Sequence, residues 1–215
     1  MTEVIKQTKS EKLLIGLLLI LILIIFYIFV ILPNKCLFVK NYDPYKINFS
    51  KPENISILNV GCGNVIIELY PDISPIAVKR FKMIINSGKY DDIAFHRVIK
   101  NVLVQSGDLE YGKKDSINYT YIGSGKSGLG TIKSEFNNQF NFEKGTVAMV
   151  RLDKKDTEDS QFFILLEDSP SFNGRYTPLG KVIYGLEVLK KIKSNDKSEY
   201  VLRPDFINTF RLLEN

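Results

Sequence analysis

A run of twenty uncharged residues near the N-terminus, Leu13 to Leu32, constrains this chain more than any other feature. As a helix that rises about 1.5 Å per residue, it spans about 30 Å, the thickness of the hydrocarbon core of a bilayer. A secretory signal peptide has a shorter apolar stretch of about 7–15 residues and a small-residue cleavage site, which Pro33–Cys36 does not offer. The run therefore predicts a transmembrane signal anchor over 13–32, after an N-terminal flank over 1–12. A cleaved signal peptide is the alternative.

The charges beside this run give little guidance on its orientation. Lysines flank it on both sides, with Lys6, Lys9 and Lys12 before it and Lys35, Lys40 and Lys46 after it. The positive-inside rule therefore nearly cancels. Signal anchors of this layout often leave the N-terminus in the cytosol, so we expect a single-pass membrane protein with its domain on the lumenal or extracytoplasmic side. Three N-x-[ST] sequons, at Asn48, Asn54 and Asn118, permit this side without establishing it.

The remainder of the chain has the composition of one folded domain. Residues 33–52 contain Pro44 and Pro52 among polar residues and are interpreted as a stalk, which leaves 53–215 for a domain with a substantial core. The chain is 45% hydrophobic and 25% charged, as in globular proteins. Its net charge of +5 is spread over lysines scattered among acidic residues, without a basic stripe or a nucleic-acid motif. We therefore expect a monomeric domain with no nucleic-acid partner.

Neither a metal site nor a nucleotide site is expected. Cys36 and Cys62 do not form a disulfide framework or a Cys/His cluster, and we expect Cys62 to be packed and unpaired. A single histidine excludes a site made of several histidines. Gly123–Gly128 contains a Gly-Lys-Ser triplet, but a P-loop requires glycine at position 120, where this chain has threonine. We interpret that segment as a flexible loop.

The hydrophobic periodicity predicts many short strands and two helices. Ser74 and Pro75 favour a helix start, with serine as the N-cap and proline in the first turn. Apolar residues then recur at helical spacing until Gly88 ends the helix. A second, short helix is expected over 186–193. Strands are expected over 65–70, 94–99, 102–105, 145–150, 161–166, 179–183 and 206–213. This pattern suggests a closed antiparallel β-barrel.

Three segments combine an arginine, glutamines and large apolar residues: Phe95–Ile99, Gln105–Asp108 and Ser160–Ile164. Arginine supplies a permanent cation, glutamine supplies a polar anchor, and the apolar side chains supply a hydrophobic slot. The set contains no nucleophile and no metal cage, so it suits chemistry on an uncharged amide. Taken alone, Arg97 could be a surface strand residue, and His96 is most simply a packing or hydrogen-bonding residue.

These segments lie within a series of blocks that resembles the cyclophilins, a family of peptidyl-prolyl cis-trans isomerases. The blocks are Gly63–Asp72, Ser74–Phe81, Tyr90–Ile99, Glu135–Phe136 with Gly145–Met149, Asn173–Val182 and Gly185–Val188. The resemblance covers roughly the last three quarters of the chain. It implies a mainly β fold, a cyclophilin-like closed eight-stranded antiparallel β-barrel capped by two α-helices, here preceded by a transmembrane helix. It implies no cofactor and no metal.

The resemblance also implies site residues and a function. Arg97 would be the catalytic arginine and Gln105 its anchor. The residues implied in substrate binding are Val102, Leu103, Val150, Arg151, Gln161, Phe163, Phe172 and Tyr176. Of these, Val102, Leu103, Phe163, Phe172 and Tyr176 would form the proline pocket, and the main chain at Arg151 would pair with the substrate peptide. The expected function is isomerisation of X-Pro bonds in protein clients, which assists folding or conformational switching at a membrane.

The chain departs from the usual cyclophilin pattern within the pocket. Val102 stands where most members carry phenylalanine and removes much of one pocket wall, whereas Leu103 for methionine is nearly isosteric. Tyr176 replaces a frequent histidine. Ser171 replaces the tryptophan that usually grips cyclosporin, so cyclosporin binding is expected to be weak. Two alternatives stay open: a proline-peptide docking module with little or no turnover, and a rigid scaffold in a membrane assembly.

Overall fold

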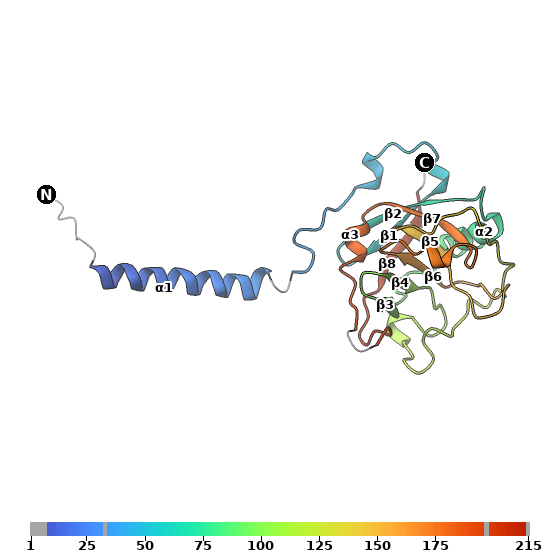
Figure 1. Ribbon diagram of the computed structural model, residues 1–215. Helices are drawn as coiled ribbons and strands as arrows, with labels where there is room; N and C mark the ends of the chain where they lie inside the picture. The colour runs from blue at the N-terminus through green and yellow to red at the C-terminus, as the bar shows by residue number, and fades with distance from the viewer. Residues whose placement is uncertain (1–7, 32–33, 196–197, 214–215) are drawn as a thin grey trace. The chain divides into compact units, whose positions relative to one another are not determined.

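The computed structural model describes residues 8–31, 34–195 and 198–213. The chain divides into an N-terminal unit, Met1–Phe38, and a compact domain, Val39–Asn215. Figure 1 shows the long helix of the first unit and the curled sheet of the second.

The N-terminal unit contains α1 (Lys9–Phe26), which continues into a π-helical turn, Tyr27–Ile31. These 23 residues are long and apolar enough to cross a membrane, and the described part of the chain has no other such helix. The helix begins before the apolar run because a capping box precedes it. Thr8 Oγ1 accepts from the amide of Glu11, and Glu11 Oε2 accepts from the amide of Thr8. Leu32, the predicted end of the run, lies outside the described residues.

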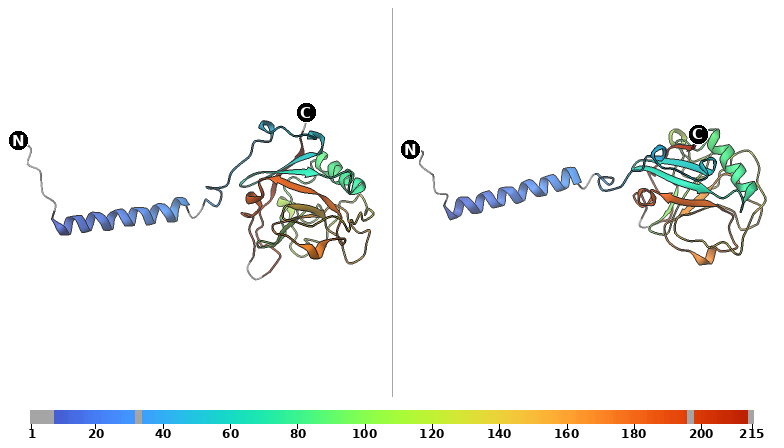
Figure 2. Two further views of the ribbon diagram at one scale, coloured as in Figure 1. Left: turned by 45° about the horizontal axis from the view of Figure 1, so that its top comes forward. Right: turned by 90° about the horizontal axis from the view of Figure 1, so that it is seen from above.

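The domain is built on one eight-stranded sheet in which every neighbouring pair is antiparallel. Its strands are β1 (Ile55–Val60), β2 (Gly63–Leu69), β3 (Arg97–Ile99), β4 (Leu103–Ser106), β5 (Thr146–Met149), β6 (Phe162–Leu165), β7 (Pro178–Tyr184) and β8 (Ile207–Leu212). They lie side by side in the order β3-β4-β6-β5-β7-β2-β1-β8. Figure 2 shows the sheet curling round so that its two ends approach each other. The predicted mainly β fold with eight antiparallel strands and two helices is confirmed.

The two ends of the sheet are joined by residues just outside β3 and β8. Ala94 and Phe206 form an antiparallel bridge. The amide of Asp92 donates to Ile207 O at 2.8 Å, and the amide of Phe95 donates to Asp205 O at 2.9 Å. The barrel is therefore closed by short irregular pairings and not by a ladder between β3 and β8. The expected strand over 94–99 is accordingly shorter, because residues 94–96 turn towards the C-terminal segment.

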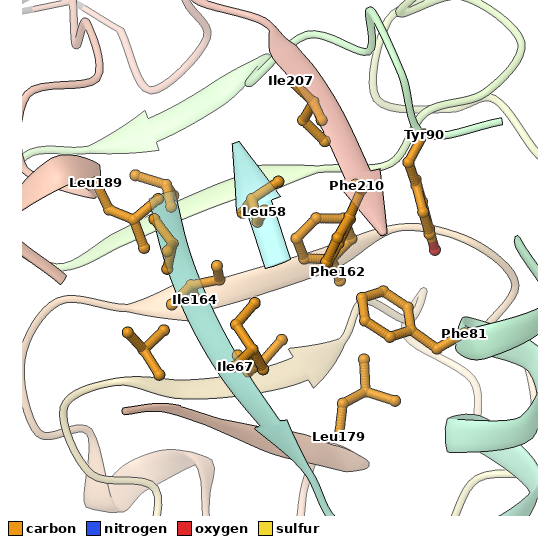
Figure 3. Packing of buried hydrophobic residues seen from close by; sticks show 14 of the residues in the cluster. Leu58, Ile67, Phe81, Tyr90, Phe162, Ile164, Leu179, Leu189, Ile207 and Phe210 are labelled. Carbon is orange, nitrogen blue, oxygen red and sulfur yellow. The ribbon is translucent and has the colours of Figure 1, made fainter. Parts of the chain in front are cut away.

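The core is an aromatic and aliphatic cluster that fills the inside of the sheet (Figure 3). Phe81 reaches into it from α2 (Pro75–Asn86), and its ring centroid lies 5.2 Å from that of Phe162 and 5.5 Å from that of Phe210. Tyr90 packs at 5.4 Å from Phe81 and donates its hydroxyl to Ser160 O at 2.7 Å. Because aromatic rings bury large areas, this cluster holds α2 against the sheet.

The first turn of α2 is capped from a distance. Proline occupies the first helical position as predicted, but Ser74 makes no side-chain cap bond. Instead the carboxylate of Glu135 accepts from the amide of Ile76 at 3.1 Å and from that of Ala77 at 2.8 Å. A carboxylate at a helix N-terminus satisfies unpaired amides and complements the helix dipole. The expected serine cap is therefore wrong in mechanism, although the helix begins where it was predicted.

Three other features of the fold differ from the sequence prediction. Strand β1 was not predicted, although Ile55–Val60 is rich in β-branched residues and ends at a glycine turn. The helix expected over 186–193 is only α3 (Leu186–Leu189). Cys36 and Cys62 are both disulfide-bonded, so the expectation of an unpaired Cys62 is wrong. Disulfide formation depends on proximity in space, which the spacing in sequence does not determine.

Part of the expected stalk packs on the domain. Within the segment 33–52, Asn41 Oδ1 accepts from the amide of Asn64 at 2.9 Å, and Tyr42 O accepts from Asn64 Nδ2 at 3.1 Å. The ring of Tyr42 lies 5.0 Å from that of Tyr184 on β7. Glycine is favoured at position 63 because its φ is +134°, which other residues rarely adopt, and a Cβ there would also lie 2.6 Å from Asn41 Oδ1. The chain is thus fixed to the sheet from about Asn41 onward.

Candidate active site

The sheet register places Arg97 and Gln105 directly opposite each other on β3 and β4. Residues opposite each other in an antiparallel pair project from the same face, with Cβ atoms about 5 Å apart. Arg97 Nη1 donates to Gln105 Oε1 at 3.2 Å. Gln105 is in turn opposite Phe163 of β6. Strand pairing therefore brings a cation, an amide and an aromatic ring together from segments separated in sequence.

The orientation of the Gln105 amide is fixed by three partners. Its oxygen accepts from Arg97, and its Nε2 donates to Gln161 Oε1 at 3.0 Å and lies 3.3 Å from His96 Nε2. Gln161 continues the chain, because its own Nε2 donates to Gly123 O at 3.0 Å and to Gly125 O at 3.1 Å. A glutamine amide has distinct donor and acceptor ends, so this series of bonds determines which end of each side chain faces Arg97.

His96 supports this arrangement in its neutral form. It is buried, and burial lowers the pKa of its imidazole below the ordinary histidine value. A neutral ring can accept from Gln105 at Nε2. Its Nδ1 is buried without a partner among the described residues. His96 therefore packs behind the site and orients Gln105, consistent with the structural role expected for it.

The loop that receives the Gln161 amide is held by Asp108. Asp108 is fully buried, and its carboxylate accepts from the amides of Gly123 at 2.6 Å and Gly125 at 3.1 Å. The same carboxylate accepts from the amides of Glu110 and Tyr111. A Cβ on Gly125 would collide with it, so glycine is required there. The expectation of a flexible loop at 123–128 is therefore wrong at its first half, and the structural role of Asp108 was missed.

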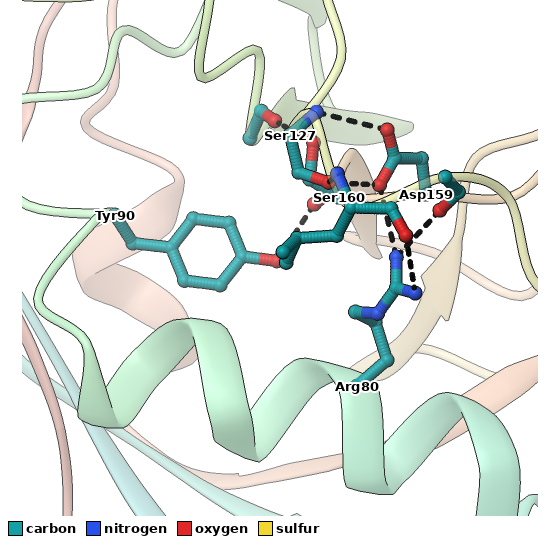
Figure 4. A network of polar contacts seen from close by, with 8 residues as sticks. Arg80, Tyr90, Ser127, Asp159 and Ser160 are labelled. Carbon is teal, nitrogen blue, oxygen red and sulfur yellow. Dashed lines mark hydrogen bonds and ion pairs between the residues drawn. The ribbon is translucent and has the colours of Figure 1, made fainter.

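A second clamp holds the following residues of the loop (Figure 4). Arg80 of α2 pairs with Asp159, with Nη1 3.1 Å from Oδ1, and also donates to Leu129 O and Gly130 O. The amide of Ser127 donates to Asp159 Oδ2 at 2.8 Å, and its hydroxyl donates to Oδ1. This network joins α2, the loop and the start of β6, next to Gln161.

The apolar residues expected in the proline pocket gather in one cluster. Leu103 and Phe163 are buried with Phe142, Ala148 and Leu165, and the partly buried members are Ile99, Val102, Phe140, Val150, Phe172 and Tyr176. The ring centroid of Phe163 lies 5.1 Å from that of Tyr176 and 5.7 Å from that of Phe172. Phe140 and Phe142 were not predicted to belong to the pocket. They lie in an Asn- and Phe-rich segment whose spacing has neither a strand period nor a helix period, so the sequence contains no signal for them.

Arg151 lies between this cluster and a small cavity. Its Nε donates to Arg175 O at 2.7 Å, and its guanidinium carbon lies 5.2 Å from the Tyr176 centroid and 5.5 Å from that of Phe136. The cavity, of about 50 Å³, is lined by residues that include Val150, Arg151, Gln161 and Gly125. The predicted site residues therefore lie in an apolar pocket and around an adjoining cavity, and Val150 belongs to both. Gln161 connects the cavity to Gln105.

One charged neighbour of Arg97 was not anticipated. Glu199 Oε2 lies 2.8 Å from Arg97 Nε and 2.6 Å from Nη2. Nothing in the sequence marks Glu199, because it stands in a polar stretch far from the motif. Across the residues that the structure describes, no group of three His, Cys, Asp or Glu side chains could hold a metal ion.

Comparison with known proteins identifies the family. The sequence profile described as cyclophilin type peptidyl-prolyl cis-trans isomerase/CLD matches residues 55–211. A probable peptidyl-prolyl cis-trans isomerase of Brucella suis is 38% identical over 159 residues, which cover 73% of this chain and 81% of the relative. Peptidyl-prolyl cis-trans isomerase B of Bacillus subtilis is 39% identical over 131 residues, which cover 60% of this chain and 82% of the relative.

Solved structures agree. A cyclophilin type peptidyl-prolyl cis-trans isomerase of Cryptosporidium parvum, crystallised in the presence of the dipeptide Ala-Pro, is similar with a TM-score of 0.65 and 26% identity, over 75% of this chain and 99% of that one. Cyclophilin AquaCyp293 of Hirschia baltica shares the fold, with a TM-score of 0.63 and 20% identity over 80% of this chain and 81% of that one. The chain belongs to the cyclophilin-type peptidyl-prolyl cis-trans isomerases.

Proposed function

We propose that Arg97 and Gln105 catalyse the cis-trans isomerisation of X-Pro bonds in protein clients, and that the proline ring binds between Val102, Phe163 and Tyr176. The observation that carries the proposal is the hydrogen bond from Arg97 Nη1 to Gln105 Oε1 beside the aromatic cluster. The Cryptosporidium parvum relative was crystallised with Ala-Pro, a ligand of the same chemical class. Val150, Arg151 and Gln161 would contact the residues that precede the proline.

The chemistry requires stabilisation of a twisted amide. Rotation about an X-Pro bond faces a barrier of about 18–20 kcal/mol, because amide resonance is lost as the bond twists. In the twisted state the prolyl nitrogen becomes pyramidal and basic. A guanidinium beside it can donate to this changed charge distribution better than to the planar ground state, which lowers the barrier. A millisecond turnover requires a barrier lower by about 7 kcal/mol.

Gln105 would contribute by holding the guanidinium in place. Arginine stays protonated at ordinary pH, so no general base is required. Gln105 presents its oxygen to Arg97 because its nitrogen is occupied by Gln161 and His96. A rotation of this amide would place N–H groups against the guanidinium and lose the bond.

A docking module without turnover is the second candidate, and Val102 is the observation that favours it. Val102 is only partly buried at the edge of the cluster, where a larger side chain would cover the proline ring. Weak binding of the proline would leave less interaction energy for the twisted state.

Substitution of Arg97 distinguishes the two. The full-length protein in detergent micelles would be assayed by NMR exchange on an Ala-Pro tetrapeptide, a method that needs no protease. We expect Arg97→Ala to lower kcat/KM by at least about tenfold, because a charge-assisted hydrogen bond contributes about 1.5–3 kcal/mol. Arg175→Ala, on an exposed loop, is the matched control. Equal rates for wild type and Arg97→Ala, with peptide binding retained, would support the docking module.

The same proposal places the domain outside the cytosol, held by α1. Support comes from the apolar helix Lys9–Ile31 and from the disulfide-bonded state of Cys36 and Cys62. Disulfides persist in oxidising compartments and are rare in the cytosol. Of the three sequons, Asn54 is buried and accepts from Lys82, whereas Asn48 and Asn118 are exposed.

Fractionation tests this placement. We expect the protein to stay in the membrane after alkaline extraction, and its cysteines to resist alkylation until a reductant is added. Protease added to sealed spheroplasts reaches only the outer side of the membrane, and protease added to inverted vesicles reaches only the cytosolic side. The preparation in which the domain is digested shows the side on which it lies. A shortened soluble protein would show a cleaved signal peptide, and cysteines alkylated without reductant would show a reducing compartment.

A further inference from the structure

We propose that Glu199 is a positioning residue for the isomerisation, because its carboxylate fixes the guanidinium of Arg97 from the side opposite Gln105. This inference rests on the proposed function of Arg97. One oxygen, Oε2, lies 2.8 Å from Nε and 2.6 Å from Nη2, so both N–H groups on that edge of the guanidinium are engaged. Gln105 holds the remaining nitrogen, Nη1, at 3.2 Å.

The main chain of Glu199 is anchored to the same strand as Arg97. The amide of Val98 donates to Glu199 O at 2.8 Å, and the amide of Val201 donates to His96 O at 2.9 Å. Arg97 and Tyr200 form an antiparallel bridge. Strand β3 ends the sheet, so this segment occupies its otherwise unpaired edge. Glu199 therefore approaches Arg97 from a backbone that hydrogen bonds hold on both sides of it.

A count of donors indicates what this arrangement leaves for a substrate. Arginine has five N–H groups. Three are used, one each on Nε and Nη2 by Glu199 and one on Nη1 by Gln105. Two remain without a partner among the described residues, one on each terminal nitrogen. Two neighbours on separate segments, Gln105 on β4 and Glu199 in the loop before β8, thus define the plane of the guanidinium. The unused donors of that plane can meet a peptide.

Two effects of the carboxylate oppose each other. It removes freedom from a side chain that would otherwise sample several rotamers, and it also offsets part of the positive charge. The side chain of Glu199 is 53% exposed and that of Arg97 is 27% exposed. Water screens the charge of an exposed carboxylate strongly, whereas the direction of a two-donor hydrogen bond survives exposure. Orientation should therefore outweigh neutralisation.

Two substitutions separate these effects. Glu199→Gln keeps an oxygen that can accept from Nε and Nη2 but removes the charge, and Glu199→Ala removes both. Each would be measured in the full-length protein in micelles by NMR exchange on the Ala-Pro tetrapeptide, with kcat and KM determined separately. Glu187→Gln is the matched control, because Glu187 on α3 pairs with Lys190, the residue that follows the helix. Thermal unfolding verifies that each variant is folded.

We expect Glu199→Ala to lower kcat by about three- to tenfold with little change in KM, and Glu199→Gln to retain at least half of the wild-type kcat. The Nε–H signal of Arg97 should exchange with water faster in Glu199→Ala than in wild type. Higher turnover in both variants would overturn the proposal and show that the carboxylate inhibits by neutralising Arg97. Unchanged kcat in both would also overturn it. If Arg97→Ala has the same rates as wild type, the proposed catalytic role of Arg97 is wrong, and that result is distinct from a failure of the role of Glu199 alone.

Discussion

Asp159 and Arg80 form an ion pair that is almost entirely removed from solvent, with Oδ1 3.1 Å from Nη1 and side-chain exposures of 8% and 13%. Asp159 also accepts two hydrogen bonds from Ser127, and Arg80 also donates to two backbone carbonyls, so each charge has several partners (Figure 4). Asp159 stands two residues before Gln161 in the chain. The pair therefore connects the outer helix of the domain to the hydrogen-bonded series that orients Arg97.

Removal of one member of this pair should be more damaging than removal of both. Arg80→Met leaves a buried carboxylate without its cation, which costs about 3–5 kcal/mol. The double variant Arg80→Met/Asp159→Ala should lose less, because no uncompensated charge remains. Urea denaturation gives both values. Lys181→Met is the control, since its pair with Glu143 is exposed and contributes under about 1 kcal/mol. A double variant less stable than the single one contradicts this account.

The N-terminus of α2 should depend on Glu135 and not on Ser74. Glu135→Ala removes the acceptor of two helix amides, with an expected loss of about 1–2 kcal/mol in the free energy of unfolding. Ser74→Ala should be neutral or stabilising, because the buried Ser74 hydroxyl has no partner among the described residues. Hydrogen exchange at the amides of Ile76 and Ala77 should accelerate only in Glu135→Ala. Equal losses in the two variants would show that serine caps the helix after all.

Acid should weaken the fold through His96. Burial lowers the pKa of the folded imidazole below 6.5, so the unfolded chain binds a proton first as the pH falls. The contribution of neutral His96 to the free energy of unfolding is complete above pH 6.5. It decreases between pH 6.5 and the lowered pKa, by at most about 1.4 kcal/mol per pH unit. Protonation would also place an N–H against the Gln105 amide nitrogen. Denaturation at a series of pH values should show this slope in wild type and not in His96→Gln. A wild-type curve that is flat below pH 6.5 excludes it.

Restoring the aromatic wall should strengthen proline binding. Val102→Phe adds apolar area at the edge of the pocket, expected to contribute about 1–2 kcal/mol, or about five- to thirtyfold in affinity for an Ala-Pro peptide. NMR titration measures this directly. Leu103→Met is the matched control, because it nearly conserves volume. If Val102→Phe leaves the affinity unchanged, the proline ring does not contact this position.

Cyclosporin should bind weakly to the wild type and more tightly to Ser171→Trp. Ser171 is exposed beside Phe172, where an indole would add apolar area and an N–H donor. An aromatic hot spot is typically worth about 1–3 kcal/mol. Isothermal calorimetry compares the two proteins, with Ser169→Trp as a control outside the expected contact. Tight binding by the wild type would contradict the expected role of this position.

The sequence by itself determined the features whose signal is local. The apolar run at Leu13–Leu32 predicts a helix suited to a membrane, the period of apolar residues after Pro75 predicts α2, and short β-branched runs predict seven of the strands. The order of motif blocks identified the family. These features can be predicted from the sequence because helix and strand periods are repeated over a few neighbouring residues.

Only the tertiary structure decided which distant residues meet. The cap on α2 comes from Glu135, the loop at Gly123–Gly125 is pinned by Asp108, and Glu199 pairs with Arg97. Asp108 and Glu135 lie in segments that stand out in the sequence, but their neighbours do not show which amides they meet, and nothing in the sequence marks Glu199. A carboxylate in a loop has the same sequence pattern whether it faces water or a buried amide. The path of the loops and the register of the sheet bring such residues within hydrogen-bonding distance, and those depend on the packing of the whole core.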